Sequence, residues 1–238
     1  MPDTPSLRAL VTDIDGTLTD GRRRLLPEAL DRIRSLEHRG VPVVLATGNV
    51  LPVALALHRF VGLTGPIVAE NGGILYERVD GEDQVRRLAD RAVALRALRA
   101  LVRAGLPARR LFTDRWRETE VALEPNLPVD RARRVLADHD VDVVPTGYAV
   151  HLIQKGRGKL YALDRALRRY RLTPADCMVA GDGENDVPIL AVAGWAVSFR
   201  DADPKARAVA DFVARRTNAF GFVEALKRAR FVAFSASR

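Results

Sequence analysis

Two carboxylates lie two residues apart at the point where an apolar run ends. In LVTDIDGTLTDG, residues 10–21, Asp13 and Asp15 follow a run of strand-forming residues and precede glycine and threonine. Aspartate is among the residues least suited to strands and to protein interiors. A strand that ends in this pair indicates either chemistry at its end or a turn that caps a following helix.

A second acidic cluster follows another apolar run. The stretch GDGENDVPIL, residues 181–190, carries Asp182 and Asp186 directly after CMVA. It is also open to a simpler interpretation, as a loop that caps its helix. Thr47 ends a third apolar run and can be an ordinary strand residue, while Lys159 can be an exposed residue in the first turn of a helix.

The elements that must position these residues alternate between apolar runs and helical patterns, which is typical of βαβ units and a parallel sheet. The pattern changes between residues 81 and 155. There we expect one long helix over 82–104, an extended segment over 109–124, a helix over 128–139 and two short strands within 141–154. We therefore predict an α/β fold with a Rossmann-like parallel-sheet core, residues 1–80 and 156–238, and an inserted α+β cap domain, residues 81–155.

The carboxyl ends of parallel strands meet at one edge of a sheet, where ligands bind. We expect four side chains to project into that crevice: Asp13, Asp15, Thr47 and Asp182. Carboxylates gathered there would repel one another unless a cation compensates them, and such oxygen ligands suit Mg²⁺. From the residues alone, the predicted metal ligands are Asp13, Asp182 and Asp186.

These residue types also suit the transfer of a phosphoryl group. A carboxylate can be a nucleophile that forms an aspartyl phosphate, which water then hydrolyses, and Asp13 is our candidate. Asp15 points to the same side of an extended backbone, so it can protonate the leaving oxygen and later take a proton from water. The phosphate oxygens need donors and a positive charge, and the candidates for substrate binding are Thr47, Gly48 and Lys159.

Taken together, the motifs resemble those of the haloacid dehalogenase-like hydrolase superfamily. DIDGT at 13–17, LATGN at 45–49, Lys159 and GDGEND at 181–186 are similar, in order, to its four motifs. The second acidic residue, Asp15, resembles the phosphatase and phosphomutase branches rather than the dehalogenases. The insert between the second and third motifs resembles the type II cap of sugar-phosphatase-like members.

Further stretches are similar to the archaeal-type phosphoglycolate phosphatases nearly end to end: ATGNVLPVALAL, GPIVAENGG, DRWRE and TGYAVHLIQKGRGK. This resemblance implies hydrolysis of 2-phosphoglycolate to glycolate and phosphate, with Mg²⁺ as cofactor, Asp13 as nucleophile and Lys159 on the substrate phosphate. It also implies that the metal is held by Asp13, Asp15, Asp182 and Asp186. Asp15 would bind through its backbone carbonyl, which leaves its side chain free for acid–base work.

The carboxylate of phosphoglycolate requires a cationic or amide donor, which the cap must supply. The candidates are Arg115, Arg117 and His151. For the two arginines, the alternatives are solvated strand faces or ion pairs with Glu118 or Glu120. For His151, the alternative is a hydrogen-bonded structural histidine.

The composition leaves other functions open. The formal net charge of +8 permits binding of nucleic acid or of anionic ligands. However, only 4 of the 38 basic residues are lysine, aromatic residues are 6% of the chain, and the arginines are interspersed with acids. A basic nucleic-acid-binding protein is therefore the least favoured alternative. A phosphatase for a sugar phosphate or another small phosphometabolite is the nearer one, since caps diverge in substrate faster than cores diverge in chemistry.

The single cysteine, Cys177, lies in an apolar run, which fits a buried residue in a reducing compartment. The sequence shows no basic-then-apolar leader and no apolar run long enough to cross a membrane. We therefore expect a cytoplasmic enzyme, a monomer or homodimer, whose partner is a small phosphorylated metabolite and not nucleic acid or a membrane.

Overall fold

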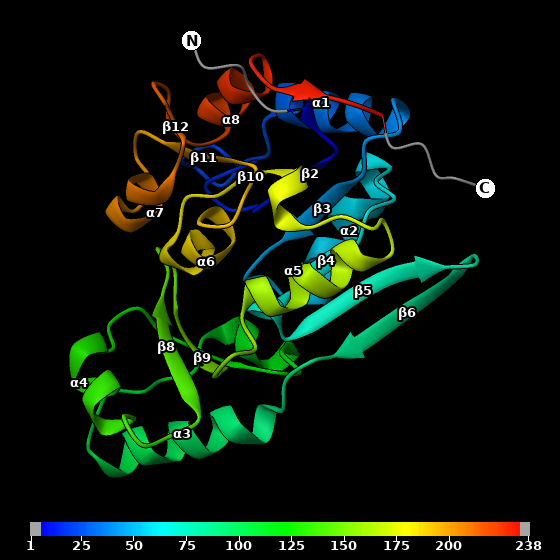
Figure 1. Cartoon of the computed structure of the whole chain (residues 1–238). Coiled ribbons are helices and arrows are strands. Elements are labelled where there is room, and N and C mark those ends of the chain that lie inside the picture. The colour runs from blue at the N-terminus through cyan, green and yellow to red at the C-terminus, as the bar shows by residue number, and fades with distance from the viewer. Residues whose placement is uncertain (1–5, 234–238) are drawn as a thin grey trace.

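The largest element of the computed structural model, which describes residues 6–233, is an eight-stranded sheet (Figure 1). Its strands lie in the order β12 (Phe212–Ala214), β11 (Trp195–Phe199), β10 (Cys177–Ala180), β2 (Ala9–Thr12), β3 (Val43–Ala46), β4 (Ile67–Ala69), β5 (Ile74–Val79) and β6 (Glu82–Arg87). The strands from β12 to β4 are parallel, while β5 and β6 pair in antiparallel fashion. The carboxyl ends of the central strands therefore share one edge.

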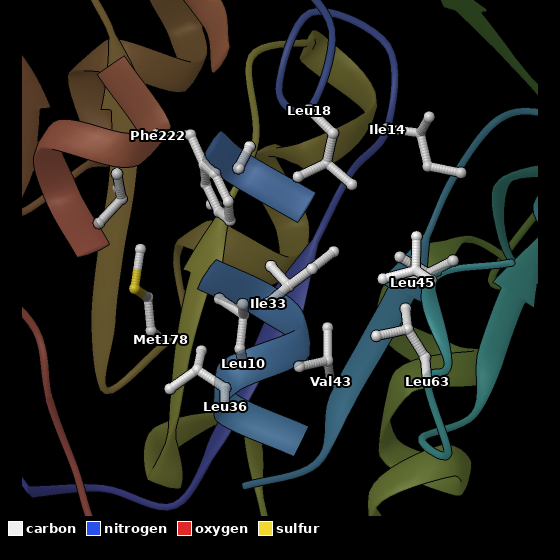
Figure 2. Packing of buried hydrophobic residues seen from close by; sticks show 14 of the residues in the cluster. Leu10, Ile14, Leu18, Ile33, Leu36, Val43, Leu45, Leu63, Met178 and Phe222 are labelled. Carbon is white, nitrogen blue, oxygen red and sulfur yellow. The ribbon is translucent and has the colours of Figure 1, made fainter. Parts of the chain in front are cut away.

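Helices cover both faces of this sheet, because its central strands are apolar on both sides. On β2, Leu10 packs into one cluster of buried residues, whereas Ala9 and Val11 pack into another on the opposite face. Figure 2 shows the first cluster, which includes Ile33 and Phe222. The helices of the first cluster are α1 (Pro27–His38), α2 (Leu51–Val61) and α8 (Asn218–Leu226), and those of the second are α5 (Lys159–Arg168), α6 (Val187–Leu190) and α7 (Pro204–Val209).

A second, smaller body has its own sheet and its own core, in the lower part of Figure 1. Its three antiparallel strands lie in the order β7 (Val121–Leu123), β9 (Val150–Gln154) and β8 (Val141–Pro145). With α3 (Arg91–Arg103) and α4 (Val129–Val135), they enclose a third buried cluster that includes Leu101 and Leu152. The chain enters this body after β6 and leaves it before α5, which confirms the predicted α/β core with an inserted α+β cap.

The predicted helix over residues 82–104 is wrong at its start. Residues Glu82–Arg87 form β6, and the helix begins only at Arg91. Asp80 and Gly81, with φ of 50° and 85°, form the tight turn between β5 and β6. An Asp-Gly pair is a strong hairpin signal, which the arginine-rich pattern after it conceals. β6 thus extends the large sheet, although we predicted its residues to lie in the cap, and the exact domain boundary stays a prediction.

Shorter elements complete the chain: β1 (Ser6–Leu7) pairs with β13 (Arg230–Phe231), and 3₁₀ turns occur at η1 (Glu70–Gly72), η2 (Phe112–Trp116), η3 (Pro174–Asp176) and η4 (Glu184–Asp186). We predicted an extended segment over residues 109–124. This prediction is wrong in part, because η2 interrupts the segment. Within residues 6–233, no helix combines the length and apolar character needed to span a bilayer.

Candidate active site

A cavity of about 180 Å³ lies where the carboxyl ends of the central strands face the cap. Asp13 directly follows β2, and its backbone N–H donates to Ala180 O at the end of β10, 3.0 Å away. Thr47 likewise follows β3 directly. The structure brings five predicted site residues of the core together in the lining of this cavity: Asp13, Asp15, Thr47, Gly48 and Asp182.

Three carboxylates form a compact cluster beside this cavity. Oxygen atoms of Asp13, Asp182 and Asp186 all lie within 4.8 Å of one another. Asp186 is fully buried, and its Oδ2 accepts hydrogen bonds from the backbone N–H groups of Asp182, at 3.2 Å, and Gly183, at 3.0 Å. The loop after β10 therefore holds both of its aspartates in fixed positions.

The glycine of the first motif is required by this cluster. Gly16 has a φ of +74°, in the left-handed region that favours glycine. A Cβ at this position would also lie 2.2 Å from Oδ2 of Asp182. The turn after Asp15 can thus approach the second acidic loop only without a side chain, and Thr17 then donates its hydroxyl to Asp182 Oδ1 at 3.1 Å.

Lys159 is the cation of the cluster. It is 2% exposed, so the alternative of an exposed helix residue is wrong. Its Nζ donates to Asp13 Oδ1 at 3.0 Å and to Asp186 Oδ1 at 2.6 Å. Lys159 is the first residue of α5, where the helix dipole disfavours a positive charge, and these two carboxylates offset that cost. Lys159 lines an adjoining cavity of about 530 Å³ and is not among the residues that line the smaller cavity.

Burial dominates the electrostatics of these groups. Burial, together with the charges of Asp186 and Asp15, raises the pKa of Asp13 to about 7, although Lys159 lowers it. The pKa of Asp182 is raised well above its ordinary value, by burial first and then by Asp13 and Asp186. Burial alone would lower the pKa of Lys159, but the two carboxylates outweigh it and raise the value.

The acidic cluster fits a metal ion. One lysine does not balance three closely spaced carboxylates, and burial together with repulsion between the carboxylates raises the pKa of Asp13 and of Asp182. The donors are all hard oxygen atoms, which small divalent cations prefer over nitrogen and sulfur. The cluster of Asp13, Asp182 and Asp186 could therefore bind such a cation.

Asn49, which our reading of the sequence missed, organises the other residues of the crevice. Its side-chain amide donates to Oδ2 of Asp15, and its backbone N–H donates to Thr47 Oγ1 at 3.0 Å. Because the Thr47 oxygen accepts that bond, its own proton stays available for an acceptor in the cavity. The signal was present in LATGN, where Asn49 stands two residues after Thr47 at the same strand end.

The cap contributes two of the predicted residues to the cavity lining, Arg117 and His151. Arg117 is 5% exposed, and its Nη1 donates to Gly48 O at 2.9 Å and to Oε1 of Glu120. Nδ1 of His151 lies 3.0 Å from the same Glu120 oxygen. Both residues thus make the structural contacts that we gave as alternatives and also face the cavity.

The guanidinium of Arg117 keeps one edge unused. Both of its hydrogen bonds use Nη1, whereas Nε is buried and has no partner among the described residues. Burial would raise the pKa of Glu120, but His151 and Arg117 outweigh it and lower the value to about 2. The ion pair between Glu120 and Arg117 therefore persists over a wide pH range, and Nε of Arg117 is left without a partner among the described residues.

Arg115, the third predicted cap residue, does not reach the cavity. It is exposed, and its Cζ lies 4.7 Å from the centre of the Phe112 ring. Arg115 lies inside η2, whereas Arg117 follows the end of that turn, where the backbone becomes extended. The two arginines therefore leave the chain in different directions.

Two residues at the end of β4 hold this part of the cap to the core. Glu70 is fully buried, and its carboxylate accepts hydrogen bonds from Glu118 N at 3.0 Å, Thr119 N at 2.9 Å and Thr119 Oγ1 at 2.6 Å. Asn71 donates its side-chain amide to Glu120 Oε2 at 2.9 Å. The segment that carries Arg117 is thus fixed by side chains of the core.

Comparison with known proteins gives a consistent assignment. A family model described as haloacid dehalogenase-like hydrolase matches residues 10–108 and 138–226. A phosphoglycolate phosphatase of Methanothermobacter thermautotrophicus is 39% identical over 222 residues, which cover 93% of this chain and 98% of that protein. A phosphoglycolate phosphatase of Methanoculleus marisnigri is 38% identical over 227 residues, which cover 93% and 96%.

Solved structures agree with the fold. A crystal structure of a protein from Thermoplasma acidophilum superposes with a TM-score of 0.84 at 29% identity and covers 94% of this chain and 98% of its own. A sugar phosphatase described as subclass IIB of the same superfamily gives a TM-score of 0.76 at 19% identity, over 92% and 98% of the two chains. At that identity, the second likeness concerns the fold alone.

Proposed function

The chain belongs to the haloacid dehalogenase-like hydrolase family, and from this premise we propose that it is a Mg²⁺-dependent phosphatase that hydrolyses 2-phosphoglycolate to glycolate and phosphate. The observation that carries the proposal is that one small cavity is lined by both Asp13 and the buried Arg117. Phosphoglycolate has an anionic group at each end, so its phosphate can meet the core while its carboxylate meets the cap. The names of the archaeal relatives support this substrate.

The first half of the reaction transfers the phosphoryl group to the enzyme. A carboxylate oxygen of Asp13 forms a bond to phosphorus, and the bond from phosphorus to the glycolate oxygen breaks. Asp15, held by Asn49, gives its proton to that leaving oxygen. Lys159, whose Nζ lies 3.0 Å from Asp13 Oδ1, orients the nucleophile and supplies positive charge for the incoming phosphate oxygens. Glycolate then leaves.

The second half releases phosphate and restores the enzyme. Asp15, now a carboxylate, takes a proton from a water molecule whose oxygen forms a bond to phosphorus. The bond from phosphorus to Asp13 breaks, which returns Asp13 as a carboxylate and Asp15 as an acid. The Thr47 hydroxyl and the Gly48 backbone line the cavity where the transferred phosphate oxygens lie during both steps.

Asp13, Asp182 and Asp186, with the backbone carbonyl of Asp15, would hold Mg²⁺. When bound, Mg²⁺ supplies positive charge that neutralises phosphate oxygens and permits an anionic nucleophile to approach them. The buried carboxylates support this role, because burial and mutual repulsion raise the pKa of Asp13 and of Asp182, and a divalent cation would favour their ionised forms.

The unused Nε edge of Arg117 is our candidate for the carboxylate of the substrate. A guanidinium edge binds a carboxylate through two parallel hydrogen bonds, which gives orientation as well as affinity. His151, fixed through Glu120, supplies a second polar group to the same lining. Sugar phosphates lack a carboxylate, so the proposal predicts that they are poorer substrates.

Phosphate release tests this proposal. The panel contains 2-phosphoglycolate, several sugar phosphates and an aryl phosphate, each with Mg²⁺ or with EDTA. We expect the highest kcat/KM for phosphoglycolate, no release in EDTA, and full recovery when excess Mg²⁺ is added back. A higher kcat/KM for a sugar phosphate would contradict phosphoglycolate as the substrate but would still support the phosphatase reaction. No release from any ester with Mg²⁺ present would discard the phosphatase and favour a binding protein.

A further inference from the structure

Two loop tips, one from the core and one from the cap, meet at the cavity. The core loop follows the first motif, and Thr19 and Leu25 close it through an antiparallel bridge. Inside it, Asp20 Oδ1 accepts hydrogen bonds from the backbone N–H groups of Arg22, at 2.8 Å, and Arg24, at 3.0 Å. Arg23 stands between them with a φ of 60° and an exposed side chain. The loop is therefore preformed around Asp20 and presents Arg23 at its tip.

The cap tip is the turn between β8 and β9. Thr146 N–H donates to Ala149 O at 2.8 Å, and Ala149 N–H donates to Thr146 Oγ1 at 3.2 Å. This double contact fixes a tight turn, on which Tyr148 is 39% exposed. Tyr148 therefore lies on a turn of fixed geometry, and its side chain is partly exposed to solvent.

The two tips are in direct contact. Cζ of Arg23 lies 3.5 Å from the centre of the Tyr148 ring, the geometry of a cation–π pair. Both residues line the same cavity of about 180 Å³ that Asp13 and Arg117 line. Because both side chains also meet solvent, the pair lies between the cavity and the outside. Its contact with the cavity and its exposure together place it at the mouth.

We propose that Arg23 and Tyr148 form a latch that closes the mouth of the cavity and limits the size of the leaving group. The proposal rests on the proposed function only in that the substrate is a phosphate ester bound with its phosphate at Asp13. The closed pair would leave room beneath it for an ester as small as phosphoglycolate. It would exclude the larger leaving group of a hexose phosphate, which then binds productively only when the pair separates.

A buried contact between cap and core contrasts with the latch. Glu70 is fully buried and accepts three hydrogen bonds from Glu118 and Thr119 of the cap. The latch consists of two exposed side chains, and an exposed cation–π pair is weak. Opening of the cavity therefore separates Arg23 from Tyr148 and leaves the Glu70 anchor intact.

Selectivity for size tests the latch. The readouts are the ratios of kcat/KM for two small esters, 2-phosphoglycolate and ethyl phosphate, over kcat/KM for glucose 6-phosphate. We expect Tyr148→Ala and Arg23→Ala each to lower both ratios by about threefold or more, because a weak closing contact is lost and the mouth widens. Since the two residues act as one pair, the double variant should lower the ratios no further than either single variant does.

Two matched variants separate the latch from general effects. Tyr148→Phe keeps the aromatic ring and should match the wild type. Arg22→Ala removes a neighbouring exposed arginine of the same loop and should also match the wild type, which excludes an effect of loop charge. The thermal midpoint of each variant reports whether the fold is intact.

The outcomes are distinct. Unchanged ratios in both Tyr148→Ala and Arg23→Ala would overturn the latch. A fall in the phosphoglycolate ratio without a fall in the ethyl phosphate ratio would also overturn the latch. Such a result would indicate that Arg23 binds the substrate carboxylate. A third outcome is that the wild type does not hydrolyse phosphoglycolate, while the ratio for ethyl phosphate over glucose 6-phosphate is lower in the variants than in the wild type. The latch would then stand and the proposed function would fail.

Discussion

The core half and the cap half of the cavity are built in different ways. On the core side, Asp13 and Thr47 each follow a buried parallel strand directly, and Lys159 begins a helix. On the cap side, Arg117 follows a 3₁₀ turn and Tyr148 lies in a hairpin turn. Regular elements thus place the groups proposed to transfer the phosphoryl group, and irregular segments place those proposed to recognise the rest of the substrate.

The difference shows how one fold can keep its chemistry while its substrate changes. The core groups are fixed by the strand pairing of the large sheet, so they cannot move independently. The cap groups are held by side-chain contacts, such as the bond from Asn71 to Glu120, and not by the pairing of the large sheet. Changes in a few cap residues can therefore alter selectivity and leave the reaction itself intact.

The largest predicted effect tests the core half. Asp13→Asn removes the nucleophile but keeps the shape of the side chain, so we expect turnover of every ester to be abolished. The thermal midpoint should not fall, because the variant replaces a buried carboxylate whose charge is disfavoured. Phosphate release measures the activity, with Asp31→Asn, at an exposed ion pair, as the control. Retained turnover would show that Asp13 is not the nucleophile.

A smaller effect is expected at Asp15. Asp15→Asn cannot donate or accept the proton, and we expect phosphoglycolate turnover to fall by about 10²–10⁴-fold. An aryl phosphate needs little protonation of its leaving group, so the variant should release one equivalent of aryl alcohol in a burst and then turn over slowly. Rapid-mixing kinetics detects the burst. An unchanged steady-state rate would remove Asp15 from acid–base work.

The smallest effect concerns the stability of the cap half. The pKa of Glu120 in the folded protein is about 2, below its ordinary value of 4.5. The ionised carboxylate therefore stabilises the fold fully above about pH 4.5, and this contribution is lost as the pH falls towards 2. Glu120→Gln should lower Tm at pH 7, and its difference from the wild type should narrow towards low pH. Glu124→Gln is the control, and a difference that is constant with pH would contradict the assignment.

The core half could be predicted from the sequence, because its chemistry requires particular residue types at strand ends. Asp13, Thr47 and Asp182 each follow a short apolar run, and parallel pairing brings such run ends together. Their convergence needed no knowledge of side-chain directions. Asn49 was missed because a single amide in a turn-rich motif does not distinguish itself from a turn former.

The cap half was predictable only in part, because it depends on tertiary contacts. Arg115 and Arg117 are equivalent as sequence candidates, and only the end of η2 at Trp116 decides that Arg117 is the one that faces the cavity. The anchoring role of Glu70 follows from three bonds to residues 48 or 49 positions away. The hairpin at Asp80 and Gly81 had a local signal, which the helical pattern beyond it outweighed.

The most direct test compares two esters that differ in one group. The measurement is kcat/KM for 2-phosphoglycolate divided by kcat/KM for 2-hydroxyethyl phosphate, in which a hydroxymethyl group replaces the carboxylate. The wild type, Arg117→Lys and the exposed-site control Arg115→Lys are compared. Lysine keeps the positive charge beside Glu120 but lacks the planar edge that binds a carboxylate.

We predict that the wild type and Arg115→Lys favour phosphoglycolate and that Arg117→Lys lowers the ratio by about tenfold or more, with hydrolysis of 2-hydroxyethyl phosphate nearly unchanged. That result would separate the selectivity of the cap from the chemistry of the core. An unchanged ratio in Arg117→Lys, or an equal loss for both esters, would contradict this division of the cavity.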